Sequence, residues 1–273
     1  MNVLRRLTYR RELRGLTWRL GLSRVLRKWY YHWACPRNGI LQLGAGGITG
    51  KFQIHTCEEL RFLEAMALYE RPVLDLVIGT VKPGDTVYDI GANVGVYAVL
   101  LAKAVGQQGQ VIAFEPESAS YDRLQHNLKL NGLANVRSFR KALGDCNSEA
   151  KLYLGDVGNL SLLPPDTRGM SYEVVELVRG DSFREAENLP LPRAVKIDVE
   201  GYEYAVLRGL RHTLAQRACE FVSCEIHPTL LPKEVRPDVV LTFIESLGFG
   251  HIKVYPGWHV FHAIAAKGDA TTQ

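Results

Sequence analysis

The 273-residue chain contains no run of eighteen or more apolar residues, so its sequence predicts no membrane-spanning helix. Its charged start also lacks the apolar core and the small-residue cleavage site of a secretory signal. The five cysteines are odd in number, scattered and without a C-x-x-C pair, which argues against a disulfide framework or a zinc site. From these absences we expect a cytoplasmic protein with reduced thiols.

Acidic residues are nearly absent from the first 37 positions, where Glu12 is the single acid beside ten arginines and lysines. The remainder carries 23 basic against 28 acidic residues, so the formal net charge of +4 arises at the N-terminus. Leucines and tryptophans interleave with these arginines, a pattern that predicts basic amphipathic helices. We therefore divide the chain into a basic helical extension, residues 1–50, and a second domain, residues 51–273.

The basic extension has three interpretations. The favoured one is that its apolar side packs on the domain or on a second copy of the chain in a homo-oligomer. Alternatively, residues 1–37 contact an anionic membrane surface as a peripheral segment. Binding to nucleic acid ranks third, and we expect no nucleic-acid partner.

Strands and helices alternate from Thr86 onward, which is typical of a parallel sheet covered on both faces. The predicted strands span 86–90, 111–115, 136–140, 194–199 and 220–226, and the predicted helices span 95–105, 118–131 and 202–216. Before this region we expect a hairpin over 39–52 and one helix over 57–78. After it, segments 251–255 and 258–265 form an antiparallel hairpin at the sheet edge. The fold class is α/β, a seven-stranded, mostly parallel sheet with an antiparallel last strand.

A glycine turn separates the first of these strands from its helix. Gly91 and Gly95 allow positive φ and a close approach of the backbone to a ligand, and Asn93 tolerates left-handed φ better than most residues. Together with Ala92 they place backbone N–H groups at a helix N-terminus. Asp89 precedes the turn. The sequence therefore predicts a nucleotide-like ligand at this turn.

The acid before the turn indicates which ligand binds. A dinucleotide fingerprint has glycine where this chain has Asn93, and a diphosphate would be repelled by Asp89. The same carboxylate suits an ammonium group, while a ligand carboxylate meets the helix N-terminus. S-adenosyl-L-methionine carries both groups, so we expect it as the cofactor.

Two further segments complete the expected cofactor site. Glu115 and Pro116 follow the second strand, where a carboxylate accepts hydrogen bonds from both ribose hydroxyls. After the third strand, Asp145 is expected to accept from the adenine amine, with Leu143 covering the ring. Residues 155–192, irregular and rich in proline, are expected to add strands and a loop over the cleft that set substrate specificity.

The catalytic residues are expected at the tips of the fourth and fifth strands. Asp198 and Glu200 share one side if the fourth strand extends that far, and Glu225 and His227 do the same on the fifth. His227 and Asp198 compete as the base that takes a proton from an acceptor hydroxyl. Alternatively, these four residues hold a divalent cation, an interpretation that we leave open without predicting a metal. Glu203 either joins the site or stabilises a helix N-terminus.

Three sequence blocks, residues 89–95, 114–116 and 196–203, resemble in order the recurring blocks of the FkbM family of S-adenosylmethionine-dependent methyltransferases. The resemblance implies a class I, Rossmann-like methyltransferase fold and methylation of a hydroxyl on a sugar, polyketide or related natural product. The expected partner is therefore a small hydroxylated metabolite. An N-methyltransferase acting on a protein lysine or a small amine is the nearest alternative. A nicotinamide oxidoreductase and a catalytically silent binding module are further ones.

Overall fold

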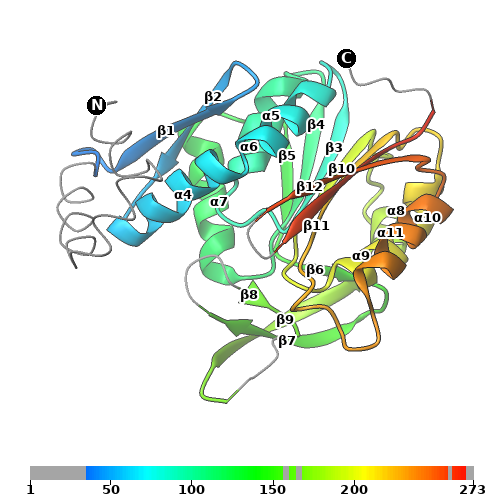
Figure 1. Ribbon diagram of the computed structural model, residues 1–273. Coiled ribbons are helices and arrows are strands. Elements are labelled where there is room, and N and C mark those ends of the chain that lie inside the picture. The colour runs from blue at the N-terminus through cyan, green and yellow to red at the C-terminus, as the bar shows by residue number, and fades with distance from the viewer. Residues whose placement is uncertain (1–34, 156–159, 164–167, 258–259, 269–273) are drawn as a thin grey trace, which may run out of the picture.

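The computed structural model describes residues 35–155, 160–163, 168–257 and 260–268 (Figure 1). The basic amphipathic helices predicted within residues 1–34 lie outside this part. None of the helices in the described part is long and apolar enough to cross a membrane.

The central sheet has seven strands in the order β12-β13-β11-β10-β3-β4-β5. Their bounds are β3 (Thr86–Ile90), β4 (Gln110–Phe114), β5 (Val136–Phe139), β10 (Ala194–Ile197), β11 (Phe221–Ile226), β12 (His251–Pro256) and β13 (Phe261–Ala266). The β10, β11, β3, β4 and β5 strands pair in parallel, whereas β13 pairs antiparallel with both β11 and β12. The predicted seven-stranded sheet with an antiparallel last strand is confirmed.

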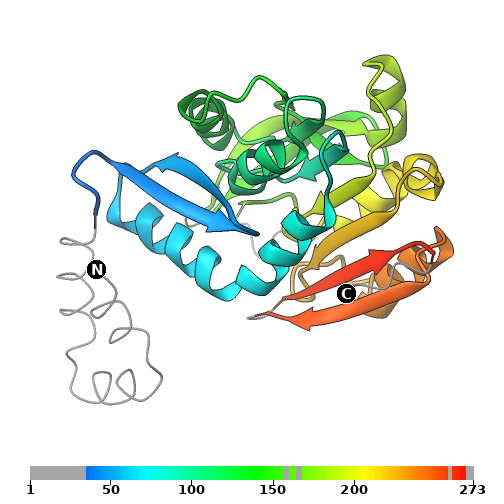
Figure 2. The ribbon, with the colours of Figure 1, turned by 90° about the horizontal axis from the view of Figure 1, so that it is seen from above.

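Helices cover both faces of this sheet (Figures 1 and 2). On one face lie α4 (Cys57–Tyr69), α5 (Arg71–Thr80), α6 (Val96–Val105) and α7 (Ser118–Leu130), and on the other lie α8 (Gly180–Ala186), α9 (Glu203–Gly209), α10 (Arg211–Ala215) and α11 (Pro237–Ser246). Successive side chains of a strand point to opposite faces of the sheet, so each strand contributes to two separate cores. In β3, Val87 packs on the α6 side, whereas Tyr88 and Ile90 pack on the α9 side.

The predicted helices are shorter in the structure. The helix expected over 57–78 is two helices, because Pro72 lacks an N–H and starts α5 after the cap residue Glu70. The helix expected over 202–216 divides at Leu210 into α9 and α10. The fourth strand ends at Ile197 instead of residue 199. Helices α8 and α11 were not predicted.

The hairpin expected over 39–52 is present as β1 (Ile40–Ala45) and β2 (Ile48–Gln53). The hairpin lies beside the helices on one face of the central sheet (Figure 2) and contacts α6 and α7. Its Leu43 and Phe52 join the core on that side of the sheet. The predicted domain boundary between residues 50 and 51 therefore falls inside β2. The partner strand β1 packs on α4 and α5.

A second, four-stranded sheet lies beyond the carboxyl ends of the central strands (Figure 1). It consists of β6 (Ala142–Gly144), β7 (Ser148–Leu154), β8 (Leu160–Ser161) and β9 (Ser171–Arg179) in the order β6-β9-β7-β8. The expectation that residues 155–192 add strands near the cleft is confirmed by β8 and β9. The space between the two sheets contains the candidate site.

Candidate active site

The glycine turn after β3 is held against the tips of two neighbouring strands. Gly91, Asn93 and Gly95 have φ values of +77°, +49° and +90°. The N–H groups of Gly91 and Ala92 donate to the carbonyl oxygen of Phe114 at 3.0 and 2.9 Å. A Cβ on Gly91 would lie 1.7 Å from the carbonyl oxygen of Asp198, so glycine is required here.

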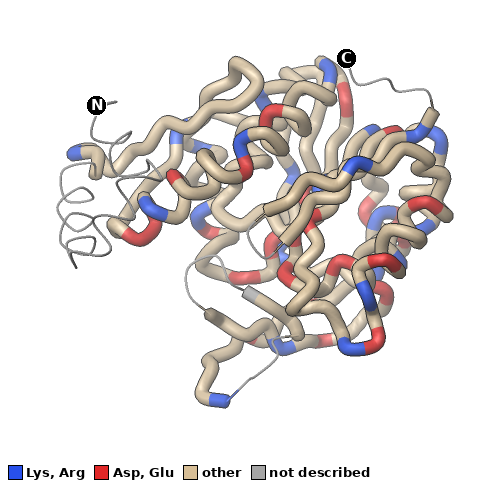
Figure 3. The backbone as a smooth tube through the Cα atoms, in the orientation of Figure 1, with Lys and Arg blue, Asp and Glu red and all other residues tan. Residues whose placement is uncertain are grey.

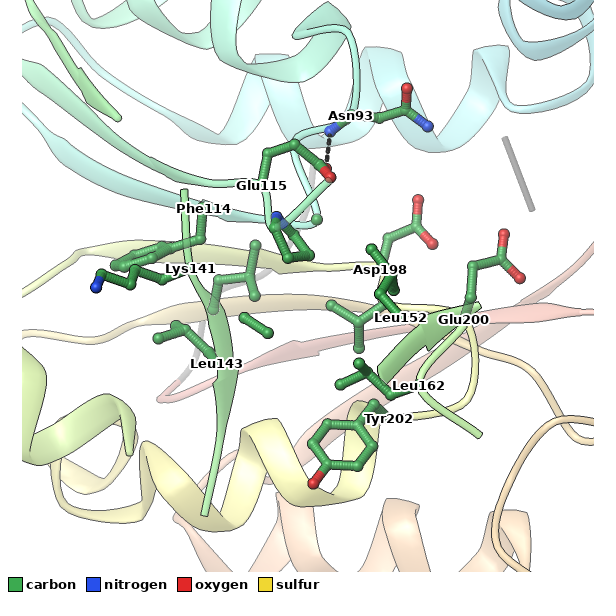
Figure 4. A pocket seen from close by; sticks show the side chains of 15 residues that line it. Asn93, Phe114, Glu115, Lys141, Leu143, Leu152, Leu162, Asp198, Glu200 and Tyr202 are labelled. Carbon is green, nitrogen blue, oxygen red and sulfur yellow. Dashed lines mark hydrogen bonds between the residues drawn. The ribbon is translucent and has the colours of Figure 1, made fainter. Parts of the chain in front are cut away.

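Glu115 lies at the tip of β4 and is only 3 % exposed. Its Oε2 accepts from the Asn93 N–H at 2.7 Å (Figure 4), and its Oε1 accepts from the Glu117 N–H at 2.9 Å. Burial raises the pKa of Glu115 to about 7. The two backbone bonds fix the carboxylate and leave lone pairs on both oxygens for further donors.

These residues open into a cleft with an empty volume of about 610 Å³ including its mouth. Its walls come from the tips of β3, β4 and β10 and from the small sheet (Figure 4). The lining residues are Ile90, Gly91, Asn93, Phe114, Glu115, Pro116, Lys141, Ala142, Leu143, Leu152, Leu162, Asp198, Val199, Glu200 and Tyr202. Polar groups thus lie along the central sheet, while leucines form the opposite wall.

Most, but not all, of the predicted site residues meet at this cleft. Gly91, Asn93, Glu115, Pro116, Asp198 and Glu200 line it. The other predicted cofactor contacts, Asp89, Ala92, Gly95 and Asp145, are not among the lining residues.

Asp89 is fully buried, and its side chain faces a cation that belongs to the protein. The Lys196 ammonium lies 3.5 Å from Asp89 Oδ1 and also donates to the carbonyl oxygen of Gly91 at 3.0 Å. Burial raises the pKa of Asp89, and the nearby Lys196 opposes this rise. The structure therefore pairs Asp89 with Lys196, where the sequence led us to expect the ammonium of the cofactor.

Asp145 does not line the cleft. Its carboxylate is paired with the Arg208 guanidinium on α9. The chain from Ala142 to Gly144 joins the small sheet as β6, and this directs the residue after it toward α9. Leu143, expected over the adenine ring, does line the cleft.

The tip of β10 turns sharply so that Asp198 and Glu200 both reach the cleft. Glu200 has φ +51° and Gly201 has φ +99°, so the strand does not continue through them. Ser161 Oγ donates to the carbonyl oxygen of Glu200 at 2.7 Å, and Gly201 N–H donates to Glu203 Oε1 at 2.8 Å. A non-glycine residue with left-handed φ carries strain that the surroundings must hold, and such strain is common at functional sites.

His227, after β11, is 5 % exposed and lies among carboxylates. Its Nδ1 is 2.6 Å from Oε1 of Glu203, which is fully buried. Its Nε2 lies 3.3 Å from Glu200 Oε2 and 3.9 Å from Asp198 Oδ1 and Glu225 Oε1. The predicted grouping of these side chains at two neighbouring strand tips is present in the structure. Figure 3 shows the acidic positions close together in this region.

The carboxylates change the proton affinities of one another and of the imidazole. Burial lowers the pKa of His227, but the Glu203 bond and the charges of Asp198 and Glu200 outweigh it and raise the value to about 10. Burial raises the pKa of Glu200 to about 7. For Asp198 burial acts upward, but Lys196 and His227 bring its pKa below the usual value. At neutral pH, His227 is therefore cationic and Asp198 anionic, while Glu200 titrates.

Sequence reasoning missed two charged residues that lie close to Asp198 and His227, namely Lys196 and Glu70. Lys196 precedes Asp198 closely in the sequence and is buried against Tyr97, whose ring centroid is 4.9 Å from its Nζ. A lysine inside an apolar strand was the signal that could have revealed it. Glu70, between α4 and α5, has a pKa of about 7 because of burial and the charge of Asp198. No local motif marks it.

The cleft lies at the carboxyl ends of β3, β4 and β10, beside a glycine turn and the buried carboxylate of Glu115, on a seven-stranded sheet with β13 reversed. This arrangement is that of a class I methyltransferase. The chain belongs to the FkbM methyltransferase family, because the methyltransferase FkbM domain matches residues 89–250, more than half of its length. The protein is thus a methyltransferase, and S-adenosylmethionine is its cofactor.

Relatives in other organisms are moderately similar in sequence. The hexuronic acid methyltransferase AglP of Haloferax volcanii is 27 % identical over 189 residues, which cover 69 % of this chain and 75 % of AglP. Methyltransferase sdnD of Sordaria araneosa is 29 % identical over 220 residues, which cover 68 % of this chain and 83 % of sdnD.

Among solved structures, an rRNA methylase from Streptococcus thermophilus aligns with a TM-score of 0.47 at 13 % identity, covering 73 % of this chain and 96 % of its own. The precorrin-6y C5,15-methyltransferase from Geobacter metallireducens aligns with a TM-score of 0.46 at 13 % identity, covering 72 % and 89 %.

Proposed function

We propose that the protein transfers a methyl group to a hydroxyl oxygen of a small molecule, a sugar, polyketide or related natural product. The observation that carries this proposal is the grouping of Asp198, Glu200 and His227 where the cofactor cleft meets the tip of β11. An alcohol must lose its proton as it attacks a methyl group, and this grouping offers proton acceptors within reach of the cleft. The name of the relative AglP supports a sugar as the acceptor.

In the cofactor half of the cleft, the chain's residues fit the groups of S-adenosylmethionine, which when bound supplies the methyl group as a sulfonium. The carboxylate of Glu115, held by two backbone N–H groups, would accept the ribose hydroxyls. The turn at Gly91 and Asn93 would receive the methionyl part, and Leu143 with its apolar neighbours the adenine. We keep Asp89, Ala92 and Gly95 as the residues that shape this turn, and assign Asp145 no contact.

In the acceptor half, Glu200 is the better proton acceptor in the protein without ligands. Its pKa of about 7 leaves it substantially ionised at neutral pH, whereas the imidazole of His227 already carries a proton. A cationic His227 would instead stabilise the negative charge that develops on the acceptor oxygen. Asp198, paired with Lys196 at 3.3 Å, stays ionised and would orient the hydroxyl.

The proposal is tested in two steps. Calorimetry with S-adenosylhomocysteine should show binding to the wild-type chain that weakens strongly in Glu115→Ala. Mass spectrometry of reactions with uronic acids, neutral glycosides, polyketides, amines and peptides should then show an O-methylated product. Absence of S-adenosylhomocysteine binding, or products methylated on nitrogen alone, would contradict the proposal.

The nearest alternative remains an N-methyltransferase acting on a lysine or a small amine. An amine that is already neutral needs little help from a base. Activity that survives in both His227→Ala and Asp198→Asn would favour this alternative. We further propose, from the sequence, a small-molecule acceptor without nucleic acid and a cytoplasmic location, with contacts of residues 1–37 to a membrane or a second copy still to be measured.

A further inference from the structure

We propose that Asp198, Glu200 and His227 form a binding site for one divalent cation, Mn²⁺ or Mg²⁺, through which the acceptor's oxygen atoms are held. The existence of the site stands on geometry alone, while its use by the acceptor rests on the proposed function.

The three ligand atoms have the spacing that a cation requires. One ligand atom from each residue lies within 4.8 Å of the others. His227 Nε2 is 3.3 Å from Glu200 Oε2 and 3.9 Å from Asp198 Oδ1. Around an ion with ligand distances of about 2.1–2.3 Å, neighbouring ligands are roughly 3 Å apart and opposite ones roughly 4.4 Å apart. The two separations from His227 Nε2 fall between these limits, so the imidazole and both carboxylates can face one ion.

The imidazole is an independent sign of a ligand. His227 is 5 % exposed, and its Nδ1 is engaged by the carboxylate of Glu203 at 2.6 Å. Among the described residues, its Nε2 has close carboxylate neighbours but makes no hydrogen bond. A histidine that binds a metal commonly donates its other ring N–H to a carboxylate, which fixes the tautomer and aims the second nitrogen at the ion. The bond between Glu203 and His227 is of this kind. Binding of the ion would displace the proton that Nε2 carries in the protein without ligands.

Asp198 remains able to bind a cation although Lys196 contacts it. Lys196 Nζ lies 3.3 Å from Oδ2, whereas the neighbour of Nε2 of His227 is Oδ1. The two oxygens of Asp198 therefore face different groups, and Oδ1 is not occupied by Lys196. Carboxylate oxygens with one imidazole nitrogen suit Mn²⁺ and Mg²⁺, which accept hard oxygen ligands and keep open positions for further ones.

Carboxyl groups also crowd around the site. The carboxylates that act on the cluster outnumber the cations Lys196 and His227; they are Glu70, Asp89, Asp198, Glu200, Glu203 and Glu225. Within the described part of the chain, Oε2 of Glu203 is buried and has no hydrogen-bond partner. A divalent cation would be attracted by the ionised members of this group, Asp198 among them.

A bound cation would also decide which acceptors enter. Without it, the carboxylates would repel an acceptor that itself carries a carboxylate. With it, a hydroxyl and a neighbouring hydroxyl or carboxylate would bind the open positions of the ion together. The expected acceptor class is therefore one with two adjacent oxygen ligands, such as a vicinal diol or an α-hydroxy acid.

The test is a titration of the full-length protein with Mn²⁺, followed by electron paramagnetic resonance of the free ion. We expect one equivalent to bind the wild-type chain, and at least tenfold weaker binding in Asp198→Asn and in Glu200→Gln. Glu220→Gln is the matched control, because Glu220 is an exposed acid paired with Arg193, and it should bind as the wild type does. A circular-dichroism spectrum and a melting temperature equal to those of the wild type would show that the fold of each variant is intact.

Two results would overturn the cation site. One is the absence of Mn²⁺ binding at millimolar concentration, and the other is equal binding by the wild type and both site variants. Methylation at full rate by protein stripped with EDTA would refute the role of the cation while leaving the methyltransferase assignment standing. Conversely, Mn²⁺ binding without S-adenosylhomocysteine binding would support the site and refute the proposed function.

Discussion

Lys196 and Asp89 are register partners on the neighbouring parallel strands β10 and β3, and Lys196 Nζ lies 3.5 Å from Asp89 Oδ1. Both side chains are buried, on the face of the sheet that carries α6. The same ammonium contacts Asp198 at 3.3 Å. One internal cation thus links the strand that precedes the glycine turn to Asp198, the acid that follows β10.

Removal of this cation should be costly. In Lys196→Met, two carboxylates lose their buried partner, so we expect a loss of about 3–5 kcal/mol in the free energy of unfolding. Urea denaturation followed by circular dichroism measures it. The double variant Lys196→Met/Asp89→Asn should recover part of the loss, and Arg71→Met, which breaks an exposed pair with Asp75, should cost about 1 kcal/mol or less. Equal stability of Lys196→Met and the wild type would contradict this account.

Gly91→Ala should abolish cofactor binding. The new Cβ would meet the Asp198 carbonyl oxygen at 1.7 Å, and alanine at φ +77° adds about 1–2 kcal/mol of backbone strain. We expect a lower melting temperature and no measurable S-adenosylhomocysteine binding by calorimetry. Gly84→Ala is the matched control, since Gly84 has φ +90° but a Cβ added there would have nothing within 4 Å. If both variants behave alike, the close approach of the two strand tips is not the cause.

Cofactor binding should strengthen as the pH rises through about 7. The pKa of Glu115 is near 7 when folded, above its ordinary value of 4.5, so its folded carboxyl is protonated below neutral pH. Only the ionised group accepts hydrogen bonds on both oxygens, and affinity should fall by up to roughly tenfold per pH unit below 7. Glu115 itself favours folding less as the pH rises from 4.5 to 7, because over this range the carboxyl ionises in the unfolded chain while the buried one still holds its proton.

Calorimetry with S-adenosylhomocysteine between pH 5.5 and 8.5 measures this dependence. Glu115→Gln should bind the cofactor weakly at every pH. The backbone N–H groups of Asn93 and Glu117 each donate to one oxygen of Glu115, and in glutamine one of those oxygens is replaced by an NH₂ group, which cannot accept. A slope that persists in Glu115→Gln would assign the titration to another group.

Asp145→Asn should leave cofactor affinity within about twofold of the wild type. Its carboxylate pairs with Arg208 and does not line the cleft, so only a half-exposed ion pair is lost. Calorimetry checks this expectation. A weakening of tenfold or more would restore the adenine contact expected from the sequence.

Glu203→Gln should slow catalysis without changing cofactor affinity. The variant keeps the size of the side chain but removes the charge that holds Nδ1 of His227. Loss of a carboxylate that orients a functional histidine commonly lowers activity by about 10–100-fold. Steady-state kinetics with an identified acceptor should show the loss in kcat. Unchanged kcat would mean that Glu203 serves only to start α9.

Local patterns sufficed for much of the fold and of the site. The strands at 86–90 and 221–226, the turn at Gly91 and Gly95, and the acid at Glu115 follow from apolar runs that end in glycine or a carboxylate. The small sheet and the split of the helix over 57–78 were harder to predict. The small sheet depends on pairing between strands that are distant in sequence. The helix splits at Pro72, although the helical pattern of apolar residues continues on both sides of it.

By itself, the sequence determined the order of elements and which acids lie at strand tips, because periodicity and glycine positions are local properties of the chain. Only the tertiary structure decided the partners of those acids. In the structure, Asp89 pairs with Lys196, Asp145 with Arg208 and Glu203 with His227. The physical reason is that a charge inside a protein must be compensated by whichever group the packing brings within a few ångströms, and that neighbour can be far away in sequence.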